Sequence, residues 1–587
     1  MNEQAVRSIH DEFALVMPMD AVISESRERL FGADGAVDFS ALESKLGPAL
    51  TKTIVTRRWF GSKARTISNL TVADWVRLAP DACLLLAEIA YTHGDADTYA
   101  IPLKLVRGST AGGSAAKPSP PLARLTITPD GESAALVDAM ADPLVAARWL
   151  EMIAGAETIA GQRGSLVATR LPRFDALRGA AGTVLAPEIL AAEQSNSSVK
   201  YGDRLILKLF RRVEAGLNPD VEVTSYLTAK LNFAHVPAVA GTLEYRRPGR
   251  PAASLAVLQG FVANQGDAWQ HTLSRVNEFF TQVTSLAAGK AKGPLPDHGL
   301  MPPGPPLVGA QKPLPVAANE WLGAFVEEAD RLGCRTAQMH LALATPTDDP
   351  EFRSETFAAA DWLAFEEATG RLIDETFAQL AERAGALPPV TRSLAERTLK
   401  LQEALRALSA WQGRPISGLR TRTHGDYHLG QILWTGADFM IIDFEGEPSR
   451  PLAERRLKHS PLRDVAGMLR SFHYAAGAAL QAKREEARRV GGGDDEVQWL
   501  APWAYAWYYW SSVAFLRAYL GTYSAEGIGA AFLPTRAEEL AGLLDAYLLE
   551  KAVYELRYEM NNRPDWLPIP LEAVFALAAE QANLGCG

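Results

Sequence analysis

Cysteine is scarce in this chain, with three residues among 587. Cys83, Cys334 and Cys586 lie far apart and are odd in number, which excludes a disulfide framework and a cysteine-based metal site. The first residues, MNEQAVRSIHDEF, are acidic where a secretory signal needs a basic start and an unbroken apolar run. Both features are typical of a protein that stays in a reducing compartment, so we expect a cytoplasmic location.

Long uninterrupted apolar runs are also lacking. The most hydrophobic segment, WAYAWYYWSSVAFLRAYL at 503–520, is rich in aromatic residues and is interrupted by Arg517. A membrane span needs about 18 or more clean apolar residues, so this segment falls short and no membrane association is expected.

Positive charge is in deficit, since 59 Lys and Arg face 69 Asp and Glu, which gives a net charge of −10 and a pI near 5.6. General nucleic-acid binding needs a basic surface, so this class of protein is excluded. We interpret the basic cluster at 455–463 as a solvated face. The remaining composition, with 48% hydrophobic and 22% charged residues, is that of an ordinary globular protein.

Hydrophobic periodicity divides the chain into three parts. Alternating runs such as LTVADWVRL and TYAIPLKLV predict antiparallel strands in a β-rich part at 1–135. Strands with one interposed helix predict a small α+β lobe at 136–262, and helical periodicity predominates at 263–587. The predicted fold class is therefore α+β with two lobes behind an N-terminal β-rich part. Segments rich in Pro or Gly at 293–315 and 490–496 are predicted to be exposed loops.

The stretch HGDYHLGQILWTGADFMIIDFEG, from His424 to Gly446, holds two aspartates 17 residues apart. ILW and FMIID are short apolar runs joined by a turn with Gly436, which predicts a β-hairpin. A hairpin brings its ends together, so Asp426 and Asp443 should lie on one rim with Gln431. Carboxylate and amide oxygens suit Mg²⁺, and one aspartate facing a hydroxyl while the other holds metal is the arrangement that phosphoryl transfer requires.

The pattern H-x-D-x-x-x-x-[N/Q], an apolar hairpin and D-F-x-G resembles the catalytic signature of the protein-kinase-like superfamily. In the form HGD with IDFEG it is similar to the aminoglycoside-phosphotransferase-like branch. Gln431 stands where protein kinases have Asn. The resemblance implies an upstream strand Lys for the nucleotide phosphates and a helix Glu that orients it. RLILKLF supplies Lys208, and NPDVEV supplies Glu222 on a helix begun by Asn218 and Pro219.

A glycine-rich phosphate loop of the type G-x-G-x-x-G is missing from the chain. The segment EQSNSS at 193–198 lies between two predicted strands, and its amides and hydroxyls can donate to phosphate oxygens. The connector LQGFV would run between the two lobes, and its main chain would meet adenine there. The predicted nucleotide contacts therefore comprise Gln194, Ser195, Asn196, Ser197, Ser198, Gln259, Phe261 and Val262.

Segments beyond this signature resemble bacterial maltokinases, including the maltokinase part of trehalose synthase/maltokinase fusions. They include DFEGEPSRPLAERRLKHSPLRDVAGMLRSFHYA, VANQGDAWQHTL, RRWFGSK and LLEKAVYELRYEMNNRPDWLPIPL, and the likeness runs from Arg57 to Leu571. It implies a bilobal protein-kinase-like fold with a cap at 1–135, a nucleotide-binding lobe at 136–262 and a catalytic lobe at 263–587. It also implies ATP-dependent phosphorylation of maltose to maltose 1-phosphate for α-glucan synthesis, with trehalose synthase as a candidate partner.

Residue roles follow from the same resemblance. Asp426 would be the base at the anomeric hydroxyl, and Gln431 and Asp443 would hold Mg²⁺. Lys208 and Glu222 would anchor the ATP phosphates. Glu445 would join the metal or the sugar shell.

The sugar site is expected on the segment EKAVYELRYE. Lys551, Tyr554 and Tyr558 lie at i, i+3 and i+7 of a predicted helix, so they share one face that offers an ammonium and two aromatic rings to a disaccharide. Arg463 either lines the same cleft or forms a buried pair with Asp464. His424, Asp426 and Glu445 complete the predicted site.

Three alternatives stay open at this stage. Another sugar kinase of the same architecture, such as a glucosamine kinase, would share every catalytic residue and differ only in the pocket. An antibiotic-modifying phosphotransferase would also fit an acidic protein, because its substrates are polycations. A catalytically dead module that docks on trehalose synthase belongs to a different class, and the intact Lys, Glu, Asp and Gln positions argue against it.

Overall fold

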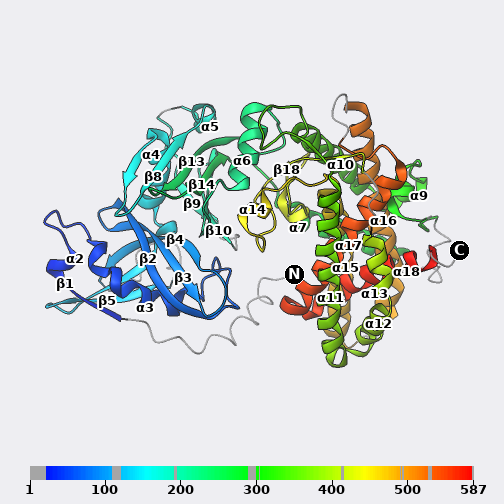
Figure 1. Cartoon of the computed structure of the whole chain (residues 1–587), viewed down its shortest axis with the longest axis horizontal. Helices are drawn as coiled ribbons and strands as arrows, with labels where there is room; N and C mark the ends of the chain where they lie inside the picture. Colours follow the sequence, from blue (N-terminus) through cyan, green and yellow to red (C-terminus); the bar gives the residue numbers. More distant parts are fainter. Residues whose placement is uncertain are drawn as a thin grey trace. The chain divides into compact units, whose positions relative to one another are not determined.

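The computed structural model describes residues 22–108, 120–180, 182–190, 195–287, 299–302, 304–410, 416–489, 491, 495–526 and 532–584 (Figure 1). It contains two compact units, and each is described by itself. The first comprises Met1–Ala229 and Pro237–Val262, and the second comprises Lys230–Val236 and Ala263–Gly587. The division into three domains stays a prediction. Within the described residues, no helix is both long and apolar enough to cross a membrane.

The first unit begins with a seven-stranded sheet. Its order is β1-β5-β6-β4-β3-β2, with β12 paired to β4. Pairing is antiparallel except between β1 and β5. The strands are β1 (Val22–Ser26), β2 (Ile67–Ala79), β3 (Ala82–Tyr91), β4 (Asp97–Arg107), β5 (Ala123–Thr128), β6 (Glu132–Asp138) and β12 (Arg212–Val213), and helix α3 (Glu43–Ile54) packs on β2.

Both faces of this sheet are buried. Successive side chains of a strand point to opposite faces. On β3, Cys83 and Leu85 therefore enter one apolar core, whereas Leu84 and Leu86 enter a second core. The second core also holds residues of the next sheet, such as Leu207 on β11. The β-rich part and the following lobe are thus joined by a common core within the first unit.

The second sheet of this unit is antiparallel in the order β7-β8-β13-β14-β11-β10-β9. Helix α6 (Pro219–Ser225) begins as predicted, because the Asn218 side chain accepts a hydrogen bond from the Asp220 amide at 2.8 Å and Pro219 stands at the first helical position. The strands are β7 (Thr158–Ala160), β8 (Ser165–Arg170), β9 (Pro187–Leu190), β10 (Asn196–Tyr201), β11 (Leu205–Phe210), β13 (Val239–Arg246) and β14 (Ala253–Gly260), and the other helices are α4 (Pro143–Gly155) and α5 (Phe174–Arg178).

Arg211, directly after β11, ties the two sheets together. Its side chain is buried, and Nη2 pairs with Asp138 at the end of β6 at 2.9 Å. Nε donates to the Ser197 hydroxyl on β10 at 2.8 Å, and the guanidinium lies 4.7 Å from the Trp59 ring centre. The Trp59 indole also donates to Asp138, at 3.2 Å. This buried charge is therefore held by partners from both parts of the unit.

The second unit is mainly helical. Long helices α10, α15, α16 and α17 pack on one another, and α11, α12, α13, α17 and α18 enclose a separate apolar cluster. The helices are α7 (Ala268–Ala287), α8 (Pro306–Ala310), α9 (Val316–Leu322), α10 (Ala324–Leu343), α11 (Ala359–Arg383), α12 (Pro389–Leu399), α13 (Gln402–Ser409), α14 (Leu452–Arg455), α15 (Leu462–Arg489), α16 (Asp495–Glu526), α17 (Ala537–Asn562) and α18 (Pro568–Leu584). The short strand pairs are β15 (Glu355–Thr356) with β16 (Leu419–Arg420) and β17 (Ile432–Trp434) with β18 (Phe439–Ile441).

The Pro-rich insertion differs from its prediction as an exposed loop. Among its described residues, Leu300, Leu307 and Ala310 are buried, and residues 306–310 form α8. The Leu300 carbonyl accepts from the Trp510 indole at 3.1 Å. The prolines mark the helix starts, because proline suits the first helical turn, and the apolar residues between them bury against α16. The α+β fold class is confirmed.

We predict that Arg211→Met lowers the free energy of unfolding of the first unit by about 3 kcal/mol. The substitution leaves the buried Asp138 carboxylate without its cationic partner. Urea unfolding measures the change. Arg212→Met is the matched control, because its half-exposed ion pair with Asp97 should contribute about 1 kcal/mol or less. Equal effects of the two variants would contradict this interpretation.

Candidate active site

The predicted hairpin is present. β17 and β18 pair in antiparallel register, with Ile432 opposite Ile441 and Trp434 opposite Phe439. Gly436 in the turn has φ of +89°, a conformation that glycine adopts without strain. Across the hairpin mouth, the Gln431 carbonyl accepts from the Ile442 amide at 3.0 Å. This bond fixes the backbone next to Asp443 relative to the segment that carries Asp426.

The HGD turn is held by Asp464, in the first turn of α15. The Asp464 carboxylate accepts from the His424 amide at 2.7 Å and from the Gly425 amide at 3.0 Å. It also bonds to His340 Nε2 on α10, at 3.1 Å. Asp464 is only 2% exposed, and Gly425 has φ of +85°. The turn that presents Asp426 is thus shaped by a buried carboxylate 38 residues later.

These partners keep Asp464 ionised. Burial alone would raise its pKa, but the hydrogen bond from His340 and the electrostatic effect of His340 and His424 outweigh burial. The Gly425 amide acts in the same direction, so the pKa of Asp464 lies below its usual range.

His424 connects the two aspartate segments through its ring. Nδ1 accepts from the Asp426 amide at 3.4 Å, and Nε2 donates to the Ile442 carbonyl at 2.9 Å. The ring is buried and lies 4.6 Å from the Phe444 ring centre. Both ring nitrogens are therefore used within the chain. The sugar contact predicted for His424 stays a prediction; in this structure the buried ring bonds within the chain.

Asp426 forms an ion pair with Lys551 on α17. Oδ1 lies 3.3 Å from Lys551 Nζ, and Oδ2 lies 3.8 Å from His428 Nε2. Burial would raise the pKa of Asp426, but the charge of Lys551 and the neighbouring His428 and His424 outweigh it and lower the pKa. The Asp426 carboxylate is consequently ionised near neutral pH and able to accept a hydrogen bond from a hydroxyl.

Glu447 is a site residue that the sequence did not indicate. Its Oε2 lies 3.6 Å from Lys551 Nζ, and its Oε1 accepts from the Tyr554 hydroxyl at 2.5 Å. Lys551 and Tyr554 therefore share a carboxylate partner, as expected for one helix face. Tyr558 is 44% exposed and lies outside the residues that line the cavities described below, although its ring is 6.5 Å from the Tyr554 ring centre.

The open question about Arg463 has a clear answer. Arg463 pairs with Glu550 on α17 at 3.0 Å, and Arg450 pairs with the same carboxylate oxygen at 3.0 Å. Asp464 instead serves the HGD turn. Burial would raise the pKa of Glu550, but the two guanidinium groups lower it. Arg463 also lines the cavity at Asp426, so it both forms a buried pair and faces the cleft.

Two adjoining cavities lie beside this network. A small one of ≈ 40 Å³ is lined by Asp426, Lys551, Tyr554 and Glu447. A larger one of ≈ 640 Å³ extends along α11. Six side chains line both cavities, namely Leu372, Arg450, Arg463, Tyr547, Glu550 and Tyr554. The volume of the larger cavity falls in the range of roughly 300–1,000 Å³ that small-molecule sites occupy.

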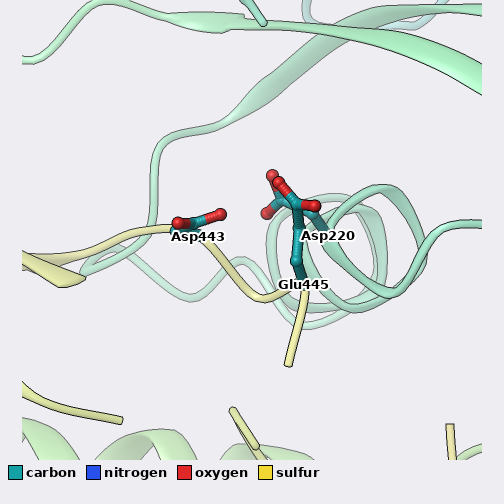
Figure 2. Close-up of side chains that lie close together, drawn as sticks. All are labelled: Asp220, Asp443 and Glu445. Atoms are coloured by element: carbon teal, nitrogen blue, oxygen red, sulfur yellow. The ribbon is translucent and has the colours of Figure 1, made fainter. Parts of the chain in front are cut away.

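Asp443 and Glu445 offer oxygen ligands on the segment that follows β18 (Figure 2). Their carboxylates approach within 4.8 Å of each other. Asp443 has φ of +66°, which is rare outside glycine and costs about 1–3 kcal/mol, so the surrounding structure must hold this residue in place. Two carboxylates at this separation fit a magnesium ion, which binds one or two protein carboxylates together with phosphate and water oxygens.

In the first unit, Lys208 lies on β11 as predicted, but the ion pair that the structure gives it is with Asp220. Lys208 Nζ and Asp220 Oδ2 are 3.1 Å apart, and Asp220 is almost fully buried. Both Asp220 and Glu222 belong to α6, and Glu222 is 7% exposed. The predicted strand lysine and acidic helix are thus present, Asp220 is an additional acidic partner of Lys208, and the role predicted for Glu222 stays a prediction.

The predicted phosphate segment is mostly strand. Asn196, Ser197 and Ser198 belong to β10, where Ser198 lies opposite Lys208 in register. Asn196 and Ser198 are buried, and Ser197 accepts from Arg211. Ser195 precedes the strand and is exposed, whereas Gln194 lies outside the described residues. The alternation of this strand, which the polar composition concealed, leaves Ser195 as the accessible hydroxyl.

The predicted adenine connector continues from β14. Gln259 lies opposite Ile206 on β11, and the Phe261 amide donates to the Arg204 carbonyl at 2.8 Å. Lys200 Nζ lies 4.6 Å from the Phe261 ring centre. Val262 is the last residue of the first unit.

Residues 54–142 match the family model described as maltokinase N-terminal cap domain. The chain carries a maltokinase N-terminal cap domain. A glucosamine kinase of Mycolicibacterium smegmatis is 23% identical over 413 residues, which cover 70% of this chain and 84% of that protein. A solved glucosamine kinase (crystal form B) superposes with a TM-score of 0.56 at 20% identity and covers 92% of this chain and 99% of its own. Glucosamine kinase in complex with glucosamine, ADP and inorganic phosphate gives 0.52 at 19% identity, with 92% and 99% covered.

These likenesses establish the fold. It is an α+β protein-kinase-like fold with an N-terminal β cap, a β-sheet lobe and a helical C-terminal region. The cap domain spans β2 to β6, and its Trp59 and Asp138 hold Arg211 beside β10. The cap therefore bonds to the sheet that carries Lys208.

We predict that Asp464→Asn lowers stability in a pH-dependent way. The folded-state pKa of Asp464 is depressed, so its contribution is present above the unfolded pKa of about 3.9 and is lost as pH falls below it. The difference in urea unfolding midpoint between wild type and variant should therefore be smaller at about pH 3 than at about pH 6.

Asp374→Asn is the control, because Asp374 pairs with Arg406 at the surface and surface pairs contribute little. A difference for Asp464→Asn that is equally large at both pH values would show that the carboxylate charge does not hold the turn.

Proposed function

We propose that this protein is an ATP-dependent sugar kinase, and specifically a maltokinase that phosphorylates maltose at its anomeric hydroxyl. The observation that carries the proposal is Asp426, an ionised carboxylate on a fixed turn that lines a small cavity adjoining a sugar-sized one, in a chain with a maltokinase cap domain. In the reaction, the anomeric oxygen bonds to the γ-phosphorus of ATP, and the bond to the β-phosphate oxygen breaks. ADP leaves with that electron pair, and the hydroxyl proton passes to Asp426.

Asp426 acts mainly by orientation in this proposal. A carboxylate with a depressed pKa is a weak base in the ground state, and it gains basicity at the moment when the hydroxyl oxygen bonds to phosphorus. Lys551 holds the carboxylate in place and offers a cation beside the transferred group. Burial would lower the pKa of Lys551, but Asp426 and Glu447 raise it, so the ammonium stays charged.

The magnesium ligands in this proposal are Gln431, Asp443 and Glu445. Mg²⁺ held by these side chains would supply positive charge against the negative charge that develops during transfer. On the nucleotide side, Lys208 with its acidic partners on α6, Asp220 and Glu222, would hold the ATP phosphates. The exposed Ser195 would donate to them, and the main chain from Gln259 to Val262 would meet adenine.

Glucosamine phosphorylation is the second candidate. It is favoured by the two glucosamine kinase structures that share the fold, and every catalytic residue would be the same. The ≈ 640 Å³ cavity next to Asp426 favours maltose, because a single amino sugar would leave much of it empty. The proposal further includes trehalose synthase as the partner that supplies maltose, and a cytoplasmic location.

We predict that maltose is the better acceptor. With ATP and Mg²⁺, kcat/KM for maltose should exceed that for glucosamine and for glucose by about tenfold or more, since the second ring adds contacts in the cavity. Coupled measurement of ADP release tests this. Turnover with glucosamine and none with maltose would overturn the maltokinase proposal and leave the sugar kinase proposal standing.

Asp426→Asn should lower kcat by roughly 10²–10⁴-fold, because it removes the proton acceptor while the turn keeps its shape. ATP affinity, measured by calorimetry, should be unchanged. Asp438→Asn is the matched control on the same hairpin, where the carboxylate pairs with Arg335 at 2.7 Å, and its kcat should match wild type. Full activity of Asp426→Asn would refute the role of Asp426.

A further inference from the structure

The larger cavity has a lining suited to a sugar chain. Trp362 and Phe365 on α11 have ring centres 4.8 Å apart, and Phe365 lies 5.2 Å from Tyr547 on α17. These three rings line one cavity, and Tyr554 lines both this cavity and the smaller one at Asp426. Aromatic faces bind the C–H surfaces of sugar rings, so the row of rings leads from the reaction centre along α11.

Polar groups accompany the rings. Arg371 on α11 is exposed, lines the cavity and has no hydrogen-bonding or ionic partner among the described residues. Arg557 lines the same cavity and pairs with Glu375 at 3.0 Å. Guanidinium groups donate several hydrogen bonds in fixed directions, which suits neighbouring hydroxyls on a sugar ring. The lining therefore combines apolar faces with unused donors.

The geometry points to a binding site for several linked glucose units, and we propose that the acceptor is a linear α-glucan oligosaccharide, of which maltose is the shortest member. This inference rests on the proposed function, which places the reducing end at Asp426. A glucan that reacts at its anomeric hydroxyl can carry additional glucose units only towards its non-reducing end. Additional units would then lie along the rings of α11, from Tyr554 towards Phe365 and Trp362.

The test compares maltose, maltotriose and maltotetraose as acceptors for the full chain. All three should be phosphorylated, with kcat/KM values within about tenfold of one another. Phe365→Leu should lower kcat/KM for maltotetraose by about tenfold and for maltose by less, because Phe365 lines only the larger cavity and its ring contacts only the units that reach it. Arg371→Ala should weaken maltotetraose binding, because it removes a charged donor from the lining.

Leu363→Ala is the matched control, since Leu363 lies on α11, is 55% exposed and does not line the cavity. Calorimetric binding of maltotetraose, without ATP, gives a second readout for each variant. Maltotetraose binding that Arg371→Ala weakens would support the site even if no sugar were phosphorylated, in which case the proposed function alone would fail. Maltose turnover with no turnover of longer chains, or equal effects at every chain length, would overturn the inference and leave the maltokinase proposal intact.

Discussion

The buried carboxylate of Asp464 organises the catalytic part of the second unit. By accepting hydrogen bonds from two consecutive amides and from His340, it fixes the turn before Asp426 against both α10 and α15. A buried charge with several donors is costly to displace, so the turn has one conformation available. The hairpin then adds the second constraint, because His424 bonds to the backbone next to Asp443. The two aspartates are thus carried by one hydrogen-bonded framework.

The charged side chains around the cavity are also held by partners, in this case of opposite charge. Asp426, Lys551 and Glu447 form a chain of alternating charge, and Glu550 lies between two arginines. The opposite charges lower the pKa of Asp426 and of Glu550 and raise that of Lys551, so these three groups stay ionised at neutral pH. An ionised Asp426 next to a charged ammonium provides both an acceptor for a hydroxyl and a cation for a developing negative charge. Lys551 lies on α17, so the packing of this helix places the ammonium that the proposed phosphoryl transfer uses.

Local sequence patterns predicted the elements that have local causes. Asn218 with Pro219 marked a helix start, and the alternating apolar runs around Gly436 marked the hairpin. The residues that the sequence left unassigned are partners across long separations. Glu447, Glu550 and the role of Asp464 depend on helices that meet only after folding, and a lone acidic residue carries no signal of its partner. In the first unit, the ion pair between Lys208 and Asp220 was also not predicted, because it depends on the rotation of α6, which residue types do not determine.

The proposed reaction makes one product, and its structure can be read by NMR. After incubation with ATP, Mg²⁺ and maltose, the phosphorus nucleus of the product should couple to the anomeric proton of the reducing glucose, as required for phosphate on the oxygen that faces Asp426. Coupling of phosphorus to another sugar proton with none to the anomeric proton would contradict this account of the site. No phosphorylated maltose at all would contradict the assignment of maltose.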